Sequence, residues 1–299
     1  MTILRLTNRP EPRPVALPED VLPLTQADIP RLRLNNHPRI AADAIARALY
    51  EMPGLSYWHP DSGEFIVCAP WRHRADVPLM RDLTAFAHED ELVQAAIAAA
   101  KAKGMLGFVA SEHYEKRRES FYQRNGLYRL EHVITFTHER VLDYLDIPQT
   151  GRLNFVRVRG SDFDLLQGVM AVDASAFSPM WRNSHAEFAW WMSLPSVEVW
   201  AGVLDGQVVT YAGITAYSRF GHLDRIAVHA DYQGQGLGAE ALMHAMYRMA
   251  ELDLPNAALC TQSDNEASQR LYTRAGFKRH QRDDYDIYGI IFEKETQPA

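Results

Sequence analysis

A cluster of glycines between an apolar run and an amphipathic segment constrains this chain more than any other feature. The run Leu223–Val228 favours a β-strand, and apolar residues recur at helical spacing from Leu237 onward. Between them lie Gly234, Gly236 and Gly238. A strand, a glycine-rich turn and a helix N-terminus form an anion site, because backbone N–H groups converge there and the helix dipole adds partial positive charge. The sequence therefore predicts a phosphate-binding loop.

Three kinds of phosphate loop compete for these glycines. A Walker loop is excluded, since no Gly-Lys-Ser/Thr follows. The Rossmann fingerprint G-x-G-x-x-A is matched by Gly234, Gly236 and Ala239, but five residues separate the first glycine from the strand, and only about 60 residues remain after the loop. The third pattern, Q/R-x-x-G-x-G/A, is matched by Gln233, Gly236 and Gly238. This third pattern also fits the sequence on both sides of the loop.

That pattern resembles the pyrophosphate loop of the GCN5-related N-acetyltransferases, the GNAT superfamily. Downstream, the segment Asn256–Phe277 contains the pattern N-x-x-(A/S)-x-x-x-Y-x-x-x-G-F, matched by Asn265–Phe277, and this pattern is similar to the family's coenzyme A-binding segment. Within it, 257–261 predicts a strand and 265–274 a helix. Upstream, 197–204, 208–217 and 221–229 predict an antiparallel meander with Asp205-Gly206 as a hairpin turn. The resemblance covers about residues 153–293.

The resemblance implies an α+β fold, with a mixed, mostly antiparallel sheet flanked by helices. It also implies transfer of an acetyl group from acetyl-CoA to a primary amine by direct attack in a ternary complex, without an acyl-enzyme. In the family, a backbone N–H of the strand, here near Val228, polarises the thioester carbonyl. The residues that the resemblance assigns to cofactor binding are Ile226, Ala227, Val228, Gln233, Gly234, Gln235, Gly236, Leu237, Gly238, Asn265 and Tyr272.

Three residues are candidates for catalysis. Tyr272 matches the family tyrosine that donates a proton to the departing thiolate, although a packed aromatic is the alternative, because Tyr122 occupies the equivalent place in the first half of the chain. His222 and Asp224 alternate on the strand and therefore point to one face. His222 lies where GCN5-type enzymes carry their base, and Asp224 could orient its ring; a structural histidine is the alternative.

The chain also contains an internal repeat. Phe121–Arg129 aligns with Leu271–Arg279 without a gap, at an offset of 272 − 122 = 150 residues. A repeat this long is one domain duplicated, which predicts a first domain over residues 1–150 and a second over 151–299. The layout is similar to that of tandem GNAT proteins such as mycothiol synthase. The first half has no glycine over Leu83–His88, the counterpart of the phosphate loop, so it resembles a degenerate GNAT domain without a cofactor site.

Elsewhere in the first half, residues 1–30 contain six prolines and predict an extended or mobile arm. Helices are predicted over 39–52, 89–103 and 114–124, with a hairpin from 55–58 and 64–71 and strands at 105–110 and 130–136. In the second half, four aromatic residues could line an acceptor pocket or pack in the core: Phe177, Trp181, Trp190 and Trp191. Arg225, Asp231 and Glu240 are interpreted as solvated charges.

Composition limits the other classes of function. The net charge of −7 argues against a broad nucleic-acid surface, and no apolar run is long enough to span a bilayer. Two cysteines, Cys68 and Cys260, do not make a disulfide framework, which favours a cytoplasmic location. Cys260 is either a reactive thiol near the cofactor or, as we favour, a small core residue. No metal site is predicted. The acceptor amine and the choice between monomer and homodimer stay open, as do two rival functions: a non-catalytic acyl-CoA-binding protein and a Rossmann oxidoreductase.

Overall fold

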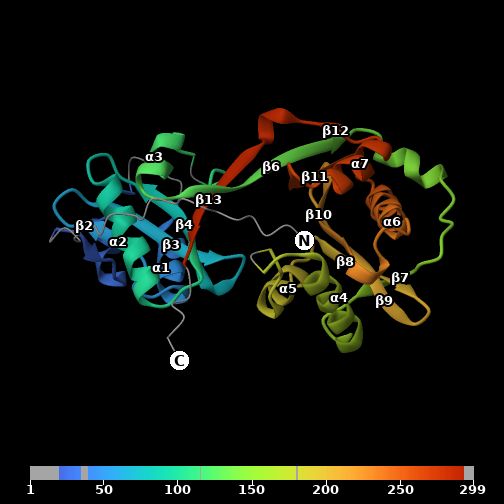
Figure 1. Cartoon of the computed structure of the whole chain (residues 1–299), viewed down its shortest axis with the longest axis horizontal. Coiled ribbons are helices and arrows are strands. Elements are labelled where there is room, and N and C mark those ends of the chain that lie inside the picture. The colour runs from blue at the N-terminus through green and yellow to red at the C-terminus, as the bar shows by residue number, and fades with distance from the viewer. Residues whose placement is uncertain (1–19, 35–39, 115, 180, 293–299) are drawn as a thin grey trace, which may run out of the picture. The chain divides into compact units, whose positions relative to one another are not determined.

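The computed structural model describes residues 20–34, 40–114, 116–179 and 181–292, in two compact units (Figure 1). The first unit comprises Met1–Leu130 and Asp286–Ala299, and the second comprises Glu131–Tyr285. Of the proline-rich arm predicted for residues 1–30, the part up to residue 19 lies outside the described residues. Among the helices that the structure describes, none is long and apolar enough to cross a lipid bilayer.

The first unit contains a mixed sheet with the strand order β1-β2-β3-β4-β5-β13, in which β4 and β5 run parallel and the other neighbours antiparallel. Its strands are β1 (Leu22–Pro23), β2 (Tyr57–His59), β3 (Glu64–Trp71), β4 (Arg74–Thr84), β5 (Gly107–Ser111) and β13 (Tyr285–Ile291). Its helices are η1 (Gln26–Arg31), α1 (Ala42–Glu51), α2 (Glu89–Ala102) and α3 (Glu119–Arg124).

The second unit contains a sheet with the order β6-β11-β10-β9-β8-β7. β10 and β11 run parallel, and the other neighbours run antiparallel. Its strands are β6 (Tyr128–His138), β7 (Asn154–Val158), β8 (Val197–Leu204), β9 (Gln207–Ala216), β10 (Phe220–Val228), β11 (Asn256–Gln262) and β12 (Lys278–Arg279), which pairs with β6. Its helices are η3 (Val141–Asp146), α4 (Phe163–Ala176), α5 (His185–Met192), η4 (Ala230–Tyr232), α6 (Leu237–Glu251), α7 (Glu266–Arg274) and η5 (Gln281–Asp283).

Helices cover both faces of the second sheet (Figure 1). On one face, Leu223 and Leu259 pack with residues of α6, α7 and η3 in one hydrophobic core. On the other face, Tyr211 and Ala227 pack with residues of α4 and α5 in a second core. This alternation along β9 and β10 is the period of two that a strand imposes. The predicted α+β fold with a mixed, mostly antiparallel sheet is confirmed, and such a sheet is not the parallel sheet of a Rossmann oxidoreductase.

The last strand of the first repeat, β6, belongs to the sheet of the second unit, and the last strand of the second repeat, β13, belongs to the sheet of the first unit. β6 follows α3 in the first repeat, yet it pairs with β11 in the second unit, with Phe136 opposite Leu259. β13 follows α7 in the second repeat, yet it pairs with β5 in the first unit, with Gly289 opposite Val109. The compact units therefore divide the chain after residues 130 and 285, whereas the repeat divides it at residue 150.

Most predicted elements are present near their predicted bounds, but five of the described strands were not predicted: β1, β4, β7, β12 and β13. β4 carries Arg81 and Asp82 in its second half and Pro78 in its middle, which hide its pattern. It nevertheless pairs with β3 along its length, with Pro78 opposite Pro70 and a register shift between Val67 and Cys68. The helix predicted over 114–124 is shorter than expected and begins only at Glu119.

Candidate active site

The glycine loop joins β10 to α6 and has the geometry of an anion cradle. Gly234 and Gly236 have φ of 77° and 84°, a region that side chains disfavour, and a Cβ at either position would meet only open space. Gly236 is the N-cap of α6, so the first N–H groups of the helix face that space without an acceptor inside the helix. The Gln233 side chain donates to the Val228 carbonyl at 3.1 Å and fixes the start of the loop. A pyrophosphate fits this cradle.

The loop is braced from the start of the second repeat. Glu240, in the first turn of α6, accepts from the backbone N–H groups of Arg152 and Leu153 at 2.8 and 3.1 Å. The Arg152 guanidinium in turn donates to the Gln235 carbonyl. The interpretation of Glu240 as merely a solvated charge was therefore wrong, because this carboxylate ties the loop's helix to the segment before β7.

The equivalent place in the first unit is already filled. There, the buried Glu64 carboxylate of β3 accepts from the backbone N–H groups of Ala87 and His88 at 3.3 and 3.0 Å, and its Oε2 lies 3.1 Å from the His88 ring. Burial raises the pKa of Glu64, but the hydrogen bonds from His88 and its neighbours outweigh it and hold the pKa below its ordinary value. An internal carboxylate thus occupies the helix N-terminus at which a phosphate would bind.

The two central strands of the second sheet separate beside the loop. β10 pairs in parallel with β11 over Phe220–Leu223, and a bulge at Asp224 follows in its register with β9. Beyond the bulge, β10 stays paired with β9 as far as Val228. The paired stretch with β11 thus ends before Ile226–Val228, the segment predicted to pair with the pantetheine arm.

His222 and Asp224 share a face, as their alternation predicted. His222 Nδ1 lies 2.7 Å from Asp224 Oδ1, and the Thr215 hydroxyl donates to Asp224 Oδ2 at 2.5 Å. Burial lowers the pKa of His222, but the hydrogen bonds to Asp224 and Cys260 outweigh it and raise the pKa to about 9. The ring is therefore mainly an imidazolium at neutral pH and becomes a base as the pH rises toward 9.

Tyr272 and Asn265 lie on and next to α7. Tyr272 is buried in the core beside Phe136 and Phe277, and burial raises its pKa to about 12, so the phenol is protonated at neutral pH. Asn265 is the N-cap of α7, and its Oδ1 accepts from the Ser268 N–H at 3.1 Å. Their cofactor and catalytic roles stay predictions: the packing of Tyr272 in the core accords with the alternative for this residue, and the cap uses the Asn265 oxygen but not its amide nitrogen.

A buried ionic cluster lies on the α4 side of β10, and sequence patterns did not reveal it. Arg225 Nε donates to Asp173 Oδ2 of α4 at 2.6 Å and to the Tyr211 hydroxyl at 2.9 Å. Its guanidinium also donates to the Trp181 carbonyl at 2.5 Å and lies 3.9 Å from the Phe177 ring centroid. The interpretation of Arg225 as a solvated charge was wrong, because this cluster fixes the chain after α4 against the sheet. An arginine among the apolar residues Leu223, Ile226 and Ala227 of the strand was the available signal.

The four aromatic residues near α4 and α5 divide between packing and surface. Trp191 is buried in the core of the second unit and packs against Gly213. Trp190 is about half exposed, at 49%. Trp181 Nε1 donates to Glu131 of β6 at 3.0 Å, and burial and the nearby Asp264 raise the pKa of Glu131. Trp181 and Glu131 therefore border the sheet face that carries His222.

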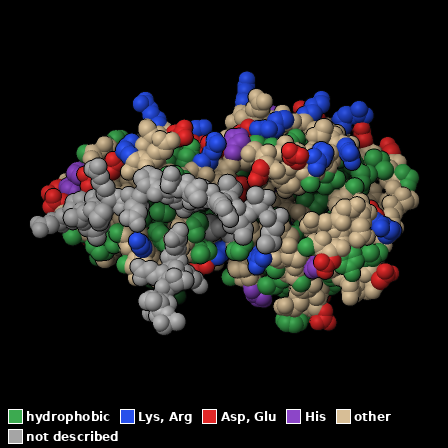
Figure 2. All heavy atoms as spheres, viewed as in Figure 1, with side chains coloured by type: hydrophobic (Ala, Val, Ile, Leu, Met, Phe, Trp, Pro, Cys, Tyr) green, Lys and Arg blue, Asp and Glu red, His purple; other side chains and the backbone are tan. Residues whose placement is uncertain are grey.

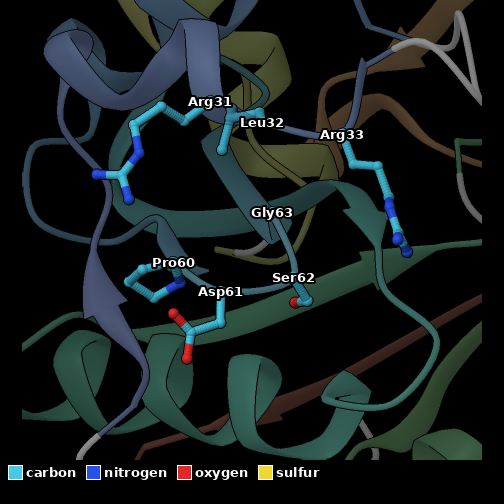
Figure 3. A pocket seen from close by; sticks show the side chains of 7 residues that line it. All are labelled: Arg31, Leu32, Arg33, Pro60, Asp61, Ser62 and Gly63. Atoms are coloured by element: carbon cyan, nitrogen blue, oxygen red, sulfur yellow. The ribbon is translucent and has the colours of Figure 1, made fainter.

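The first unit has a hollow of about 400 Å³ that is unrelated to this site (Figure 3). Arg31, Arg33 and Asp61 are among its lining residues, and the two guanidinium groups point to different sides of it in Figure 3. Arg31 also lies 4.6 Å from the Trp58 ring centroid. The two cations do not converge on one ligand position.

Comparisons with known proteins agree with this geometry. The family model described as "Acetyltransferase (GNAT) family" matches residues 169–277. No curated protein matches the sequence. A solved GCN5-related N-acetyltransferase from Sphaerobacter thermophilus is 12% identical, with a TM-score of 0.54 over 92% of this chain and 97% of its own.

Two further solved structures are similar over most of the chain. A tandem GNAT protein from the clavulanic acid biosynthesis pathway is 13% identical, with a TM-score of 0.55 over 91% of this chain and 98% of its own. A probable N-acyltransferase from Enterococcus faecalis is 9% identical, with a TM-score of 0.62 over 91% of this chain and 72% of its own. Residues 169–277 therefore match the GNAT acetyltransferase family, and the fold over most of the chain is similar to that of solved GNAT proteins, a tandem GNAT protein among them.

Proposed function

We propose that the second unit transfers an acetyl group from acetyl-CoA to a primary amine by direct attack in a ternary complex. The family supports acyl-CoA-dependent acyl transfer in general. The observation that carries the proposal is the contrast between the two helix N-termini: Gly234 and Gly236 leave that of α6 open, whereas Glu64 fills that of α2. One cofactor per chain follows from it.

The chain's own residues have separate tasks in this reaction. The backbone from Gln233 to Gly238 would hold the pyrophosphate, and the edge of β10 at Ile226–Val228 would hold the pantetheine arm. Bound acetyl-CoA supplies the thioester carbonyl, and a backbone N–H near Val228 is the proposed donor to the developing oxyanion. Holding both reactants in one geometry removes part of the entropic barrier.

His222 is the proposed base. Its Nδ1 is committed to Asp224, which leaves Nε2 for the acceptor amine or a bridging water. The pKa of His222, raised to about 9, gives a strong base whose neutral form is scarce at pH 7. Since an acceptor ammonium must also lose a proton, both groups favour reaction at alkaline pH. Tyr272, protonated throughout this range, is the proposed donor to the leaving thiolate.

The test is acceptor-dependent release of free CoA from acetyl-CoA, measured by chromatography over amines, amino acids, polyamines and peptide N-termini. We expect release with at least one class of amine, together with N-acetyl product by mass spectrometry. Binding of acetyl-CoA without release for any acceptor would instead support the rival function, a non-catalytic acyl-CoA-binding protein. Gly236→Glu is the matched variant, because its carboxylate would lie against the pyrophosphate and should abolish binding.

The remaining partners are proposed from composition. The acceptor is a small-molecule or peptide amine, and nucleic acid is not expected, since the net charge is −7. Figure 2 shows acidic and basic side chains interspersed on the face it draws, with both signs present on each unit. We also propose that the reaction takes place in the cytoplasm, which rests on the two cysteines of the sequence.

A further inference from the structure

One residue of β10 has no partner on the neighbouring strand. Leu223 lies opposite Ile214 of β9, and Arg225 lies opposite Gly213, the residue before it on β9. Asp224 is therefore the extra residue of a β-bulge. A bulge bends its strand and aims a side chain, and this one follows directly after Leu223, where the pairing of β10 with β11 ends.

The bulge reverses the alternation of faces along β10. Leu223 packs in the core around α6, so that Arg225, two residues further on, would point into that core in a regular strand. Arg225 instead contacts Asp173 of α4, and Ala227 packs with residues of α4 and α5 on the same face. A slip of one residue that removed the bulge would therefore turn Arg225 into the apolar core around α6.

The buried charge of Arg225 makes that slip unfavourable. Its side chain is 8% exposed, and that of Asp173 is 1% exposed. Arg225 Nε donates to Asp173 at 2.6 Å and to the Tyr211 hydroxyl at 2.9 Å, and the guanidinium also donates to the Trp181 carbonyl. The Tyr211 hydroxyl in turn donates to Asp173 at 2.5 Å. Because a buried charge is stable only beside such partners, the cluster fixes the register of β10 after the bulge.

Both parts of the proposed site beside the bulge depend on this register. Asp224 Oδ1 lies 2.7 Å from His222 Nδ1, and Asp224 Oδ2 accepts from the Thr215 hydroxyl at 2.5 Å. After the bulge, successive N–H groups of the strand point alternately to its two sides. A slip of one residue would therefore exchange the N–H groups of 226–228 that face β9 with those that face the open edge.

We propose that Arg225 is a positioning residue for acetyl transfer. Paired with Asp173, it holds the bulge at Asp224, and the bulge aims this carboxylate at His222 and the backbone of 226–228 at the acyl donor. This inference rests on the proposed function of the second unit. The guanidinium is buried among protein groups, so it acts on the reaction only through the Asp224 side chain and the strand that follows.

The test removes both charges of the pair and keeps the fold. Arg225→Met alone would leave the Asp173 carboxylate buried without its cation, which is strongly destabilising, whereas loss of both charges is often tolerated. The test variant is therefore Arg225→Met with Asp173→Asn, whose amide oxygen can still accept from the Asn183 N–H that Asp173 Oδ1 binds at 2.8 Å. A second neutral pair, Arg225→Gln with Asp173→Asn, offers hydrogen bonds in place of the thioether. Thermal melts followed by circular dichroism establish whether each variant folds.

The first readout is the pKa of His222, measured by NMR titration of its ring protons without any substrate. Burial lowers this pKa, but Asp224 and Cys260 outweigh it and raise the pKa to about 9. In the neutral pairs, Asp224 no longer faces the ring, so the pKa should fall by about one unit or more, as it should in Asp224→Asn. Arg225→Lys keeps a charge that belongs on the α4 side, and it should therefore retain the parent's pKa of His222.

The second readout is kcat/KM for acetyl transfer. We expect it to fall by about 100-fold or more in the neutral pairs, because the base and the backbone donor to the oxyanion are displaced together. A merely structural role would lower the melting temperature and would leave the pKa of His222 and the kcat/KM of the folded protein as they are in the parent.

A second ionic cluster of the same unit supplies the matched control. Glu198 of β8 is buried, and its two oxygens accept from Arg248 of α6, each at 3.1 Å. This pair lies on the α6 side of the sheet, the face opposite to that of His222 and Asp224. Arg248→Met with Glu198→Gln removes the same two kinds of charge and should leave both readouts at the parent's values.

Three results would overturn the proposal. One is a folded neutral pair that keeps the parent's pKa of His222 and its kcat/KM, and another is an equal change in the control at Arg248 and Glu198. The third is loss of cooperative melting in both neutral pairs, which would show that the cluster serves stability alone. The pKa of His222 is measured without acetyl transfer, so a parent protein that releases no CoA would contradict the proposed function and leave this measurement decisive.

Discussion

Removal of β6 from the second unit should unfold it, although the repeat suggests that 151–299 is a complete domain. We compare a chain of residues 151–299, cut at the repeat, with a chain of residues 131–285, cut at the bounds of the compact unit. The segment 131–150 contributes Ile134, Phe136, Val141 and Tyr144 to the core around α6. Each of these side chains is at most 5% exposed, so burial of each stabilises the unit by about 1.5–3 kcal/mol.

The four side chains together contribute about 6–12 kcal/mol. The Tyr144 hydroxyl also donates to the Ala275 carbonyl at 2.7 Å, which adds about 1 kcal/mol. A whole domain is stable by only about 5–15 kcal/mol, so the loss is as large as the total. β13 would be a poor replacement for β6 on β11. If β13 paired there in the register that it uses on β5, Gly289 would lie opposite Leu259, at the position that Phe136 occupies in the native protein.

Thermal melts followed by circular dichroism, and titration with acetyl-CoA, distinguish the two chains. We expect 131–285 to melt cooperatively and to bind acetyl-CoA, and 151–299 to show neither property. A cooperative melt of 151–299 at the same temperature as that of 131–285 would show instead that β6 contributes nothing that β13 cannot supply.

Four further predictions concern single groups. Tyr272→Phe should lower kcat with little loss of acetyl-CoA affinity, since the hydroxyl donates its proton as the thiolate departs. If kcat were unchanged while the chemical step is rate-limiting, Tyr272 would be only a packing residue. His222→Ala should lose at least about tenfold in kcat/KM together with the acidic limb near pH 9, and Asp224→Asn should move that limb to lower pH in the pH–rate profile. Burial, and after it the charge of Arg248, lowers the pKa of His244 to about 4. The stability contributed by its neutral form is therefore complete above pH 6.5 and is lost as the pH falls toward 4. In urea melts over this pH window, the free energy of unfolding of His244→Phe should fall by about 2 kcal/mol less than that of the parent protein. Direct attack predicts that mass spectrometry finds no acetyl group on the protein after incubation with acetyl-CoA alone, and acetylation of Cys260 would contradict it.

Local spacing was enough to predict the cradle and the meander. A glycine loop between a strand and a helix depends on residues that are adjacent in the chain, and Gly234 and Gly236 do adopt the positive φ that such a turn needs. The same holds for the hairpin at Asp205-Gly206, where both residues have positive φ. The contact between His222 and Asp224 also follows from alternation along one strand.

Long-range pairing decided the features that sequence patterns missed. The exchange of β6 and β13 leaves each strand's own pattern unchanged, so nothing local reveals which sheet accepts it. Arg225 is buried because Asp173 and Tyr211, 52 and 14 residues away, neutralise and bind its guanidinium. Glu64 reaches the helix N-terminus 24 residues later in the chain, and no motif marks that role.

We propose that the helix N-terminus of α6 is open to acetyl-CoA, whereas Glu64 closes that of α2. Calorimetric titration of the full chain measures it directly. We expect one site per chain, abolished by Gly236→Glu in the second unit and unchanged by Glu64→Gln in the first, where Leu83–His88 still has no glycine. Two comparable sites per chain, or a Gly236→Glu protein that binds acetyl-CoA with the parent's affinity, would contradict it.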